Sequence, residues 1–304
     1  MGVRNGRTVG QHNRSLRRRE AVQGYTFLLP NIIGFAVFTF LPIVASLVLS
    51  FTNWDGFGEL EFIGFDNFIR LFSDEVFRIS MTNTVVFTVV SVPVTLVLSL
   101  GVAMILNKGI KGIRIFRAAF FLPYITAALA VAVVWQLLYH PTLGPINQIL
   151  MMFGIKDPPG WLSSSKYAMP AVIIMYIWKM VGYYMIIFLA GLQGVPRQLY
   201  EAAKIDGAGR WQLFKNVTFP MLSPVVFFTS IIAMINSFKV FTEIYALTGG
   251  GPGNATNVLV YNIYLEAFKK YNFGYSSAMA YVLCIIIMVI TLIQFQGQKK
   301  WVNY

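Results

Sequence analysis

The sequence Tyr200–Pro220 reads YEAAKIDGAGRWQLFKNVTFP, and its two glycines divide it into two polar halves. A long apolar run lies on either side of this stretch, which predicts a loop that joins two membrane-spanning helices. The first half, Gln198–Ile205, contains residues that favour helix, and Gly207 can adopt the positive φ that ends a helix. The second half, Arg210–Val217, begins another helix that Pro220 is expected to stop or kink. The pattern therefore predicts two short helices that protrude from the membrane.

The rest of the chain has the composition of an α-helical membrane protein. It has 304 residues, of which 57% are hydrophobic and 12% are charged. A helix needs about 20 apolar residues to cross the bilayer core. Six runs of this kind are present, and none shows the short alternating segments of a β-barrel: Tyr25–Phe51, Ile79–Leu106, Ala118–Tyr139, Pro170–Leu192, Met221–Leu247 and Tyr275–Gln294. The predicted fold is all-α, a polytopic membrane protein with six transmembrane helices.

The basic residues indicate which way the chain faces. Sixteen Lys and Arg residues lie in the N-terminal tail and after the second, fourth and sixth runs, whereas the other three loops hold six. Because basic residues are enriched in cytoplasmic loops, the first set is predicted to be cytoplasmic. Both termini are then cytoplasmic, which agrees with an even number of spans. The predicted organisation is a basic tail over 1–24, a membrane domain over 25–296 with a cytoplasmic loop at Gly194–Pro220, and a short cytoplasmic tail over 297–304.

Several classes of function have no support in the sequence. The net charge of +12 comes with no basic patch interleaved with aromatic residues outside the juxtamembrane segments, so a lipid bilayer is the expected partner and nucleic acid is not. No phosphate-binding loop or acid–base catalytic set occurs, and we expect no enzymatic activity. Cys284 is the one cysteine, and His12 and His140 lie in different polar segments. We therefore expect no metal site.

The spacing within the loop resembles a known family motif. Glu201–Ala203 reads Glu-Ala-Ala, Gly207 follows after three further residues, and Val217–Pro220 follows after nine more. This pattern resembles the EAA loop of permease subunits of bacterial ABC importers, with Val217 and Phe219 at the positions where Ile and Leu are usual. The resemblance covers Tyr25 to the C-terminus and implies the type I ABC importer permease fold. The segment Leu247–Thr256 looks like a signature of the carbohydrate branch, which includes the larger maltose permease subunit and the glycerol-3-phosphate permeases.

The resemblance implies an assembly of several subunits in the bacterial cell (inner or plasma) membrane. A second homologous permease would complete a heterodimer, two cytoplasmic ABC ATPases would bind ATP and Mg²⁺, and an external solute-binding protein would deliver the substrate. This chain would bind no cofactor of its own. It departs from the larger maltose permease by lacking that protein's extra N-terminal spans and its large periplasmic domain. The residues expected to couple to the ATPases are Glu201, Ala202, Ala203, Asp206, Gly207 and Pro220.

Polar residues inside the spans are the candidates for a substrate pathway, because such residues are costly in the membrane and usually face a cavity or a partner. Lys239 and Glu243 are four residues apart, so we expect them to neutralise one another. Alignment of the fourth and fifth runs with the larger maltose permease places its sugar-contacting positions on Lys179, Met180, Tyr183, Ala233, Asn236, Ser237 and Val240. Among these, Tyr183, Asn236 and Ser237 suit a sugar, since aromatic faces pack on C–H surfaces and polar groups bind hydroxyls.

The substrate itself stays open at this point. By analogy with the family, a neutral di- or oligosaccharide is the first expectation. A cationic Lys179 favours the alternative of an anionic sugar derivative or glycerol 3-phosphate. A secondary transporter is a further alternative, although the six runs show no inverted repeat of the kind found in such carriers.

Overall fold

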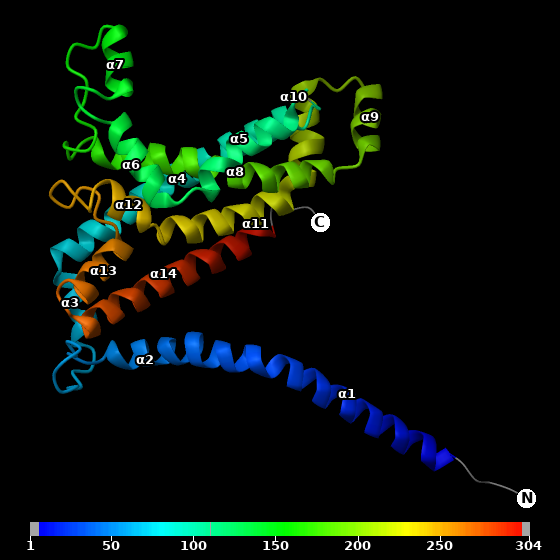
Figure 1. Ribbon diagram of the computed structural model, residues 1–304. Coiled ribbons are helices and arrows are strands. Elements are labelled where there is room, and N and C mark those ends of the chain that lie inside the picture. Colours follow the sequence, from blue (N-terminus) through cyan, green and yellow to red (C-terminus); the bar gives the residue numbers. More distant parts are fainter. Residues whose placement is uncertain (1–5, 110, 300–304) are drawn as a thin grey trace, which may run out of the picture.

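The computed structural model of the protein describes residues 6–109 and 111–299, and for residues 6–19 and 21 it describes the backbone only. The described part is built from helices, with one isolated bridge between Thr52 and Phe62 (Figure 1). This confirms the predicted all-α class. The predicted tails over 1–24 and 297–304 lie partly outside the described residues. The helices are α1 Gly6–Phe35, the π-helical turn η1 Ala36–Phe40, α2 Leu41–Leu49, α3 Asp66–Ser73, α4 Glu75–Leu106, α5 Ile113–Ile125, α6 Ala128–Leu138, α7 Pro145–Met152, α8 Ala168–Gln193, α9 Arg197–Ile205, α10 Arg210–Leu213, the π-helical turn η2 Phe214–Thr218, α11 Phe219–Phe238, α12 Thr242–Leu247, α13 Leu259–Phe268 and α14 Phe273–Gln298.

Five continuous helical segments in the described chain are long and apolar enough to cross a membrane, and a bent pair makes a sixth. The continuous segments are Val22–Leu49, Glu75–Leu106, Ala168–Gln193, Arg210–Phe238 and Phe273–Gln298. They correspond to five of the six predicted spans. The predicted third span, Ala118–Tyr139, differs, because it is divided into α5 and α6 with a bend of 99° between them.

The break in the third span has a local cause and a packing cause. Pro123 removes a backbone donor from α5, and Thr126 and Ala127 then adopt extended conformations. At the same level α5 lies directly against α8, where Gly182 leaves room for the carbonyl of Phe120. A Cβ atom built on Gly182 would lie 1.7 Å from that carbonyl oxygen. The close approach of the two backbones therefore depends on this glycine.

The predicted fifth span, Met221–Leu247, is also interrupted. Its main helix, α11, ends at Phe238, and the chain passes through three residues before α12. In the other direction the helix extends further than predicted, because α10, η2 and α11 form one continuous segment from Arg210. Pro220 therefore does not stop the helix, and the prediction of a separate second short helix is wrong. The π-helical turn η2 lies directly before Pro220, and such a wider turn accommodates a proline that lacks an amide donor.

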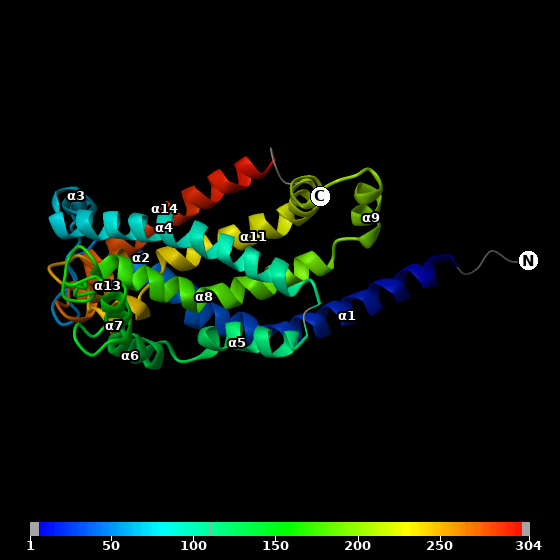
Figure 2. The same cartoon turned by 90° about the horizontal axis from the view of Figure 1, so that it is seen from above.

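The helix α8 lies at the centre of the bundle. Figure 2 shows α8 among α4, α5 and α11, against which it packs, and α8 also contacts α12. Two thirds of the residues in its most apolar 18-residue stretch are buried within the chain, whereas none are buried in the corresponding stretch of the first span. The first span diverges from the bundle and contacts it where α2 meets α14 (Figure 1).

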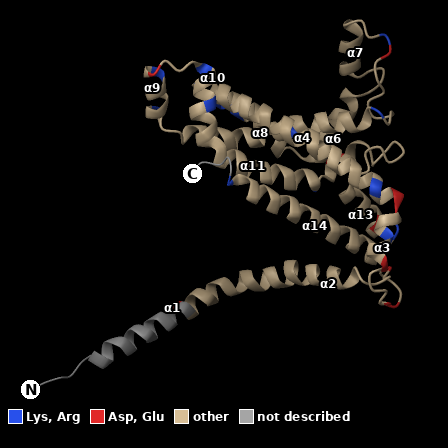
Figure 3. Cartoon of the chain, turned by 180° about the vertical axis from the view of Figure 1, so that it is seen from behind, with Lys and Arg blue, Asp and Glu red and all other residues tan. Residues whose placement is uncertain are grey.

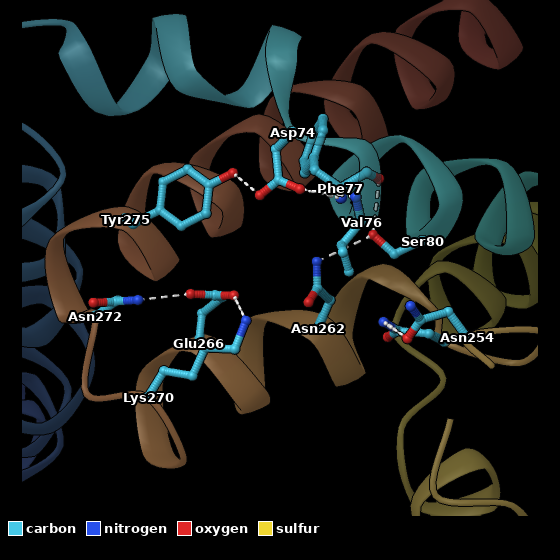
Figure 4. Close-up of polar contacts among 11 residues, drawn as sticks. Asp74, Val76, Phe77, Ser80, Asn254, Asn262, Glu266, Lys270, Asn272 and Tyr275 are labelled. Atoms are coloured by element: carbon cyan, nitrogen blue, oxygen red, sulfur yellow. Dashed lines mark hydrogen bonds and ion pairs between the residues drawn. The ribbon is translucent and has the colours of Figure 1, made fainter. Parts of the chain in front are cut away.

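A polar cluster fixes the end of the bundle that lies opposite α9 (Figure 4). Asp74 accepts hydrogen bonds from the amides of Val76 and Phe77 at the start of α4, and from the Tyr275 hydroxyl at 2.6 Å. Burial opposes ionisation of Asp74, but the bonds from Tyr275 and the two amides outweigh it and lower the pKa of this carboxyl. Nearby, Glu266 lies between Lys270 and Asn272. These contacts join α4, α13 and α14.

The contact at Gly182 gives a testable prediction. We expect Gly182→Ala to separate α5 from α8, because the new Cβ would meet backbone that cannot rotate away, and to destabilise the protein by about 1–3 kcal/mol. Thermal unfolding of the purified protein in detergent would measure this. Gly101→Ala is the matched control, since this helical glycine on α4 has open space around its Cβ position. An equal effect of both substitutions would show that the contact is unimportant.

Candidate functional site

The seven residues proposed for the substrate pathway fall into two groups in the structure. Tyr183 on α8 and Asn236 on α11 are half-buried and reach the surface of the chain. The remaining positions are buried within the chain: Lys179, Met180, Ala233, Ser237 and Val240. The first three predicted residues lie on α8, the next three on α11, and Val240 lies in the break before α12. Of the seven, Tyr183 and Asn236 are therefore the ones that the chain itself leaves partly uncovered.

Lys179 forms a buried ion pair with Glu243. Its Nζ lies 2.8 Å from the Glu243 Oε1, and both side chains are about nine-tenths buried. This corrects the expectation that Glu243 pairs with Lys239, which is exposed at the C-terminal end of α11. The α11 helix ends at Phe238 and Glu243 belongs to α12, so Lys239 and Glu243 do not share one continuous helix and a spacing of four residues does not place them on one face. The pair instead joins α8 to α12, across the break in the fifth span.

Tyrosine rings extend the surface at Tyr183. The ring of Tyr124, on α5, stacks on that of Tyr183 with centroids 4.5 Å apart and an angle of 21°. Tyr184 contacts Tyr183 edge-on, and its hydroxyl accepts a hydrogen bond from the Asn236 Nδ2 at 3.4 Å. The sequence analysis did not identify Tyr124, because it used only the fourth and fifth spans. The one feature of the sequence that could have indicated Tyr124 is its place directly after Pro123, inside an apolar run. The arrangement presents aromatic faces and an amide from three different helices.

The C-terminal parts of the two interrupted spans, α6 and α12, pack on each other. The α6 and α12 helices are in contact, and Gln136 of α6 donates to the carbonyl of Ala246 at 2.9 Å. Non-helical backbone at membrane depth occurs in proteins only where it is buried or lines a water-filled cavity. In transporters, interrupted helices of this kind mark the substrate site. The two breaks therefore point to the same region as Tyr183 and Asn236.

The loop after α8 forms a protruding helix, α9. The amide of Gly207 donates to Lys204 and that of Ala208 to Ala203, with Gly207 at φ +81°, so the helix ends in a Schellman motif. A hydrogen bond of 3.2 Å between the Tyr200 hydroxyl and the Thr218 Oγ1 holds α9 to the bundle. Of the predicted coupling residues, Glu201, Ala202, Asp206 and Gly207 are exposed, and Ala203 and Pro220 are half-buried.

Two large apolar side chains stand out on this loop. Ile205 is 87% exposed at the end of α9, and Trp211 is 71% exposed at the start of α10. Exposed apolar groups at a protruding element mark protein contacts, and Trp is enriched among the residues that dominate such contacts. The sequence analysis did not select them, although an isoleucine and a tryptophan in a polar loop were a visible signal.

The segment Leu247–Thr256 forms a compact loop at the opposite end of the bundle. Thr256 donates to the carbonyl of Gly251 at 2.8 Å, and its hydroxyl lies 2.7 Å from that of Thr248. Asn83 of α4 donates to the carbonyls of Asn254 and Asn257, which fixes the loop to the bundle. The glycine-rich sequence is thus a tightly hydrogen-bonded loop.

A bundle of helices apolar enough to cross a membrane, two of them interrupted, together with a protruding helix at one end, is typical of a membrane transport protein. The chain belongs to the family described as "Binding-protein-dependent transport system inner membrane component", which matches residues 112–299. It is accordingly a permease subunit of the ABC importer class, and its role is transport.

Individual relatives and a solved structure agree with this family. The chain is 39% identical to the "Probable ABC transporter permease protein YesP" of Bacillus subtilis, over 99% of this chain and 97% of that protein. It is 37% identical to the "Lactose transport system permease protein LacF" of Rhizobium radiobacter, over 94% and 97%. It is 36% identical to the "sn-glycerol-3-phosphate transport system permease protein UgpA" of Yersinia pestis, over 92% and 95%. A chain in the crystal structure of a "bacterial alginate ABC transporter in complex with alginate pentasaccharide-bound periplasmic protein" has the same fold, with a TM-score of 0.83 at 24% identity, over 94% of this chain and 96% of that chain.

The buried ion pair gives a second prediction. We expect Lys179→Met or Glu243→Gln alone to destabilise the protein by about 3–5 kcal/mol, because each would leave an unpaired partner in a buried site. The double variant is expected to lose less than the sum of the two, and a double-mutant cycle of thermal unfolding would measure the coupling. Lys239→Met is the control, since Lys239 is exposed. Coupling of Glu243 to Lys239 instead of Lys179 would refute this pairing.

Proposed function

We propose that this chain forms one half of the pathway of a bacterial sugar importer. In this proposal a second homologous permease completes the pathway, and two ATPase subunits that bind ATP and Mg²⁺ drive it from the cytoplasm. The observation that carries the proposal is the exposed α9 helix, with Ile205 and Trp211 uncovered beside it. An isolated helix of nine residues is marginal in water, so its fixed geometry and uncovered apolar groups favour a permanent protein partner.

The proposed orientation places α9 in the cytoplasm of the cell and the Leu247–Thr256 loop outside. The start of α1 and the end of α14 lie at the same end of the molecule as α9, which supports cytoplasmic termini (Figure 1). Acidic residues gather mainly around α3 at the other end, where the chain lacks the excess of basic residues typical of a cytoplasmic face (Figure 3). An external solute-binding protein would dock at the α3 end. The alginate transporter structure contains such a periplasmic protein, which supports this part of the proposal.

The proposed substrate is a neutral di- or oligosaccharide. The names of relatives and of the solved structure refer to lactose, glycerol 3-phosphate and alginate, so carbohydrates and their derivatives are the common theme. The stacked Tyr124 and Tyr183 offer faces for the C–H surface of a pyranose, and Asn236 offers a donor and an acceptor for hydroxyls. Lys179, which favoured an anionic substrate, is neutralised by Glu243. The alternative of an anionic sugar derivative or glycerol 3-phosphate is supported by the exposed Lys239 and by the names that refer to glycerol 3-phosphate and to alginate, an acidic polysaccharide.

Substitutions on the tyrosine surface test the pathway. We expect Tyr183→Ala, Asn236→Ala and Tyr124→Ala each to reduce uptake about tenfold, since each removes a stacking face or hydrogen-bonding group. Cells with the complete transporter would be given labelled lactose, maltose or glycerol 3-phosphate, with protein levels measured in parallel. Phe116→Ala on α5 is the control, because Phe116 is exposed and lies eight residues, about two helical turns, before Tyr124. Normal uptake by all three variants would exclude this surface, and a loss confined to glycerol 3-phosphate in Lys239→Gln would favour the anionic alternative.

The helix end at Gly207 tests the coupling. Valine strongly disfavours a φ of +81°, so we expect Gly207→Val to disrupt the Schellman motif and to release or uncouple the ATPase while the membrane bundle stays folded. Gly207→Asn is the matched control, because asparagine tolerates this conformation. Glu201→Gln should have a milder effect, since an exposed ion pair contributes about 0–1 kcal/mol. The measurement is ATPase retention and substrate-stimulated hydrolysis of the purified complex. Equal values for the valine and asparagine variants would remove α9 from the coupling mechanism.

A further inference from the structure

A positively charged pocket lies at the α9 end of the bundle, where α4 ends and α5 begins. It has a volume of about 540 Å³ and is lined by residues of α4, α5, α8 and α9. Two of these residues are charged, Arg117 and Arg197, and no acidic residue is among them. The helix dipoles of α4 and α8 place about half a negative charge at each of their C-terminal ends, and the two positive guanidinium groups outweigh this. The pocket therefore favours an anion.

Arg117 is incompletely satisfied in this pocket. Its Nε is buried and has no hydrogen-bond partner among the residues that the structure describes. Buried donors in proteins are almost always paired, and an unpaired one costs free energy. The side chain as a whole is only half-buried, so its remaining donors can still reach a group that enters the pocket. A guanidinium of this kind is suited to a phosphate, which it can bind through two parallel hydrogen bonds.

An apolar groove of about 610 Å³ lies between the same three spans, α4, α5 and α8. On α4 it is lined by Val94, Leu98 and Val102, and Leu106, four residues further on, lines the charged pocket. On α5, Phe120 lines the groove, and Arg117, one turn earlier, lines the pocket. Residues three and four apart share one face of a helix. The groove and the pocket therefore follow one another along the same helix faces.

The length of the combined site matches one leaflet of a bilayer. At 1.5 Å per residue, α4 rises about 18 Å from Val94 to Leu106. The hydrocarbon core of a bilayer is about 30 Å thick, so one leaflet contributes about 15 Å. The charged end of the site is then at headgroup depth, and the apolar end reaches toward the middle of the membrane.

We propose that the pocket and the groove together bind one anionic glycerophospholipid, with its phosphate on Arg117 and an acyl chain between α4, α5 and α8. Basic pockets between transmembrane helices are known to hold anionic headgroups. A free phosphate would leave the groove uncovered, and a carboxylate of a partner protein would do the same. Tyr200 of α9 lines the same pocket, so a bound phosphate would lie at the base of the protruding helix. This site goes beyond the proposed transport function and does not depend on which solute is carried.

Native mass spectrometry of the purified full-length protein tests the headgroup site. The probes are phosphatidylglycerol and phosphatidylcholine with identical acyl chains, added separately to the protein in detergent. We expect phosphatidylglycerol to bind more tightly, and Arg117→Gln to weaken it about tenfold, to the level of phosphatidylcholine. Arg114→Gln is the matched control, because Arg114 is exposed on the same helix and does not line the pocket. Arg117→Lys should keep the preference for the anionic lipid, and thermal unfolding would confirm that each variant is folded.

The groove needs a separate variant. Leu98→Trp should fill it and weaken both lipids, whereas Val97→Trp should not, because Val97 is 70% exposed and lies outside the groove. Equal binding of the two lipids, equal losses in the Arg117 and Arg114 variants, or no effect of Leu98→Trp would each overturn the proposal. Displacement of phosphatidylglycerol by inorganic phosphate would overturn it in favour of a free-anion site. Unchanged lipid binding with release of an ATPase from the complex in Arg117→Gln would overturn it in favour of a protein contact.

Discussion

The structure depends on the requirement that every backbone amide and carbonyl inside a bilayer has a partner, because no water is present there to supply one. This requirement makes the spans helical, and it also restricts where a helix can be interrupted. The chain is interrupted twice, between α5 and α6 and between α11 and α12. The α6 and α12 helices pack against each other, and Gln136 of α6 donates a hydrogen bond to the carbonyl of Ala246 at the end of α12. The interruptions are thus supported by the protein, and they concentrate polar groups in one region.

The central helix α8 connects these features. Gly182 lets α5 approach its backbone, Lys179 reaches across to Glu243 near the start of α12, and Tyr183 stacks on Tyr124. A helix that is buried on most sides has little freedom to move alone, so α5, α8 and α12 are expected to move as one body. The α9 helix follows α8 after three residues. A displacement of α9 would therefore be transmitted directly to the residues around Tyr183.

The two ends of the bundle are stabilised in different ways. At the end opposite α9, side chains close the structure, through Asp74 with Tyr275 and through the bonds of Asn83 to the Leu247–Thr256 loop. At the α9 end the Tyr200 hydroxyl contacts the Thr218 Oγ1, while Ile205 and Trp211 are exposed. An end with large apolar side chains exposed in the single chain is suited to binding other protein subunits. The charged pocket at Arg117 lies at this same end.

The sequence by itself determined the class of the fold, the approximate places of the apolar spans and the helix end at Gly207, but not the breaks in the third and fifth spans. These features depend on local properties: the length of apolar runs, the fixed spacing of the loop and the ability of glycine to adopt a positive φ. The register also selected Tyr183 and Asn236, and both lie within continuous helices and reach the surface of the chain. Only the tertiary structure decided that Pro220 lies inside a continuous helix, that Glu243 pairs with Lys179 and that Tyr124 faces Tyr183. Each of these depends on where one helix meets another or on a turn that widens locally, and spacing along the chain contains no information about such contacts between distant residues.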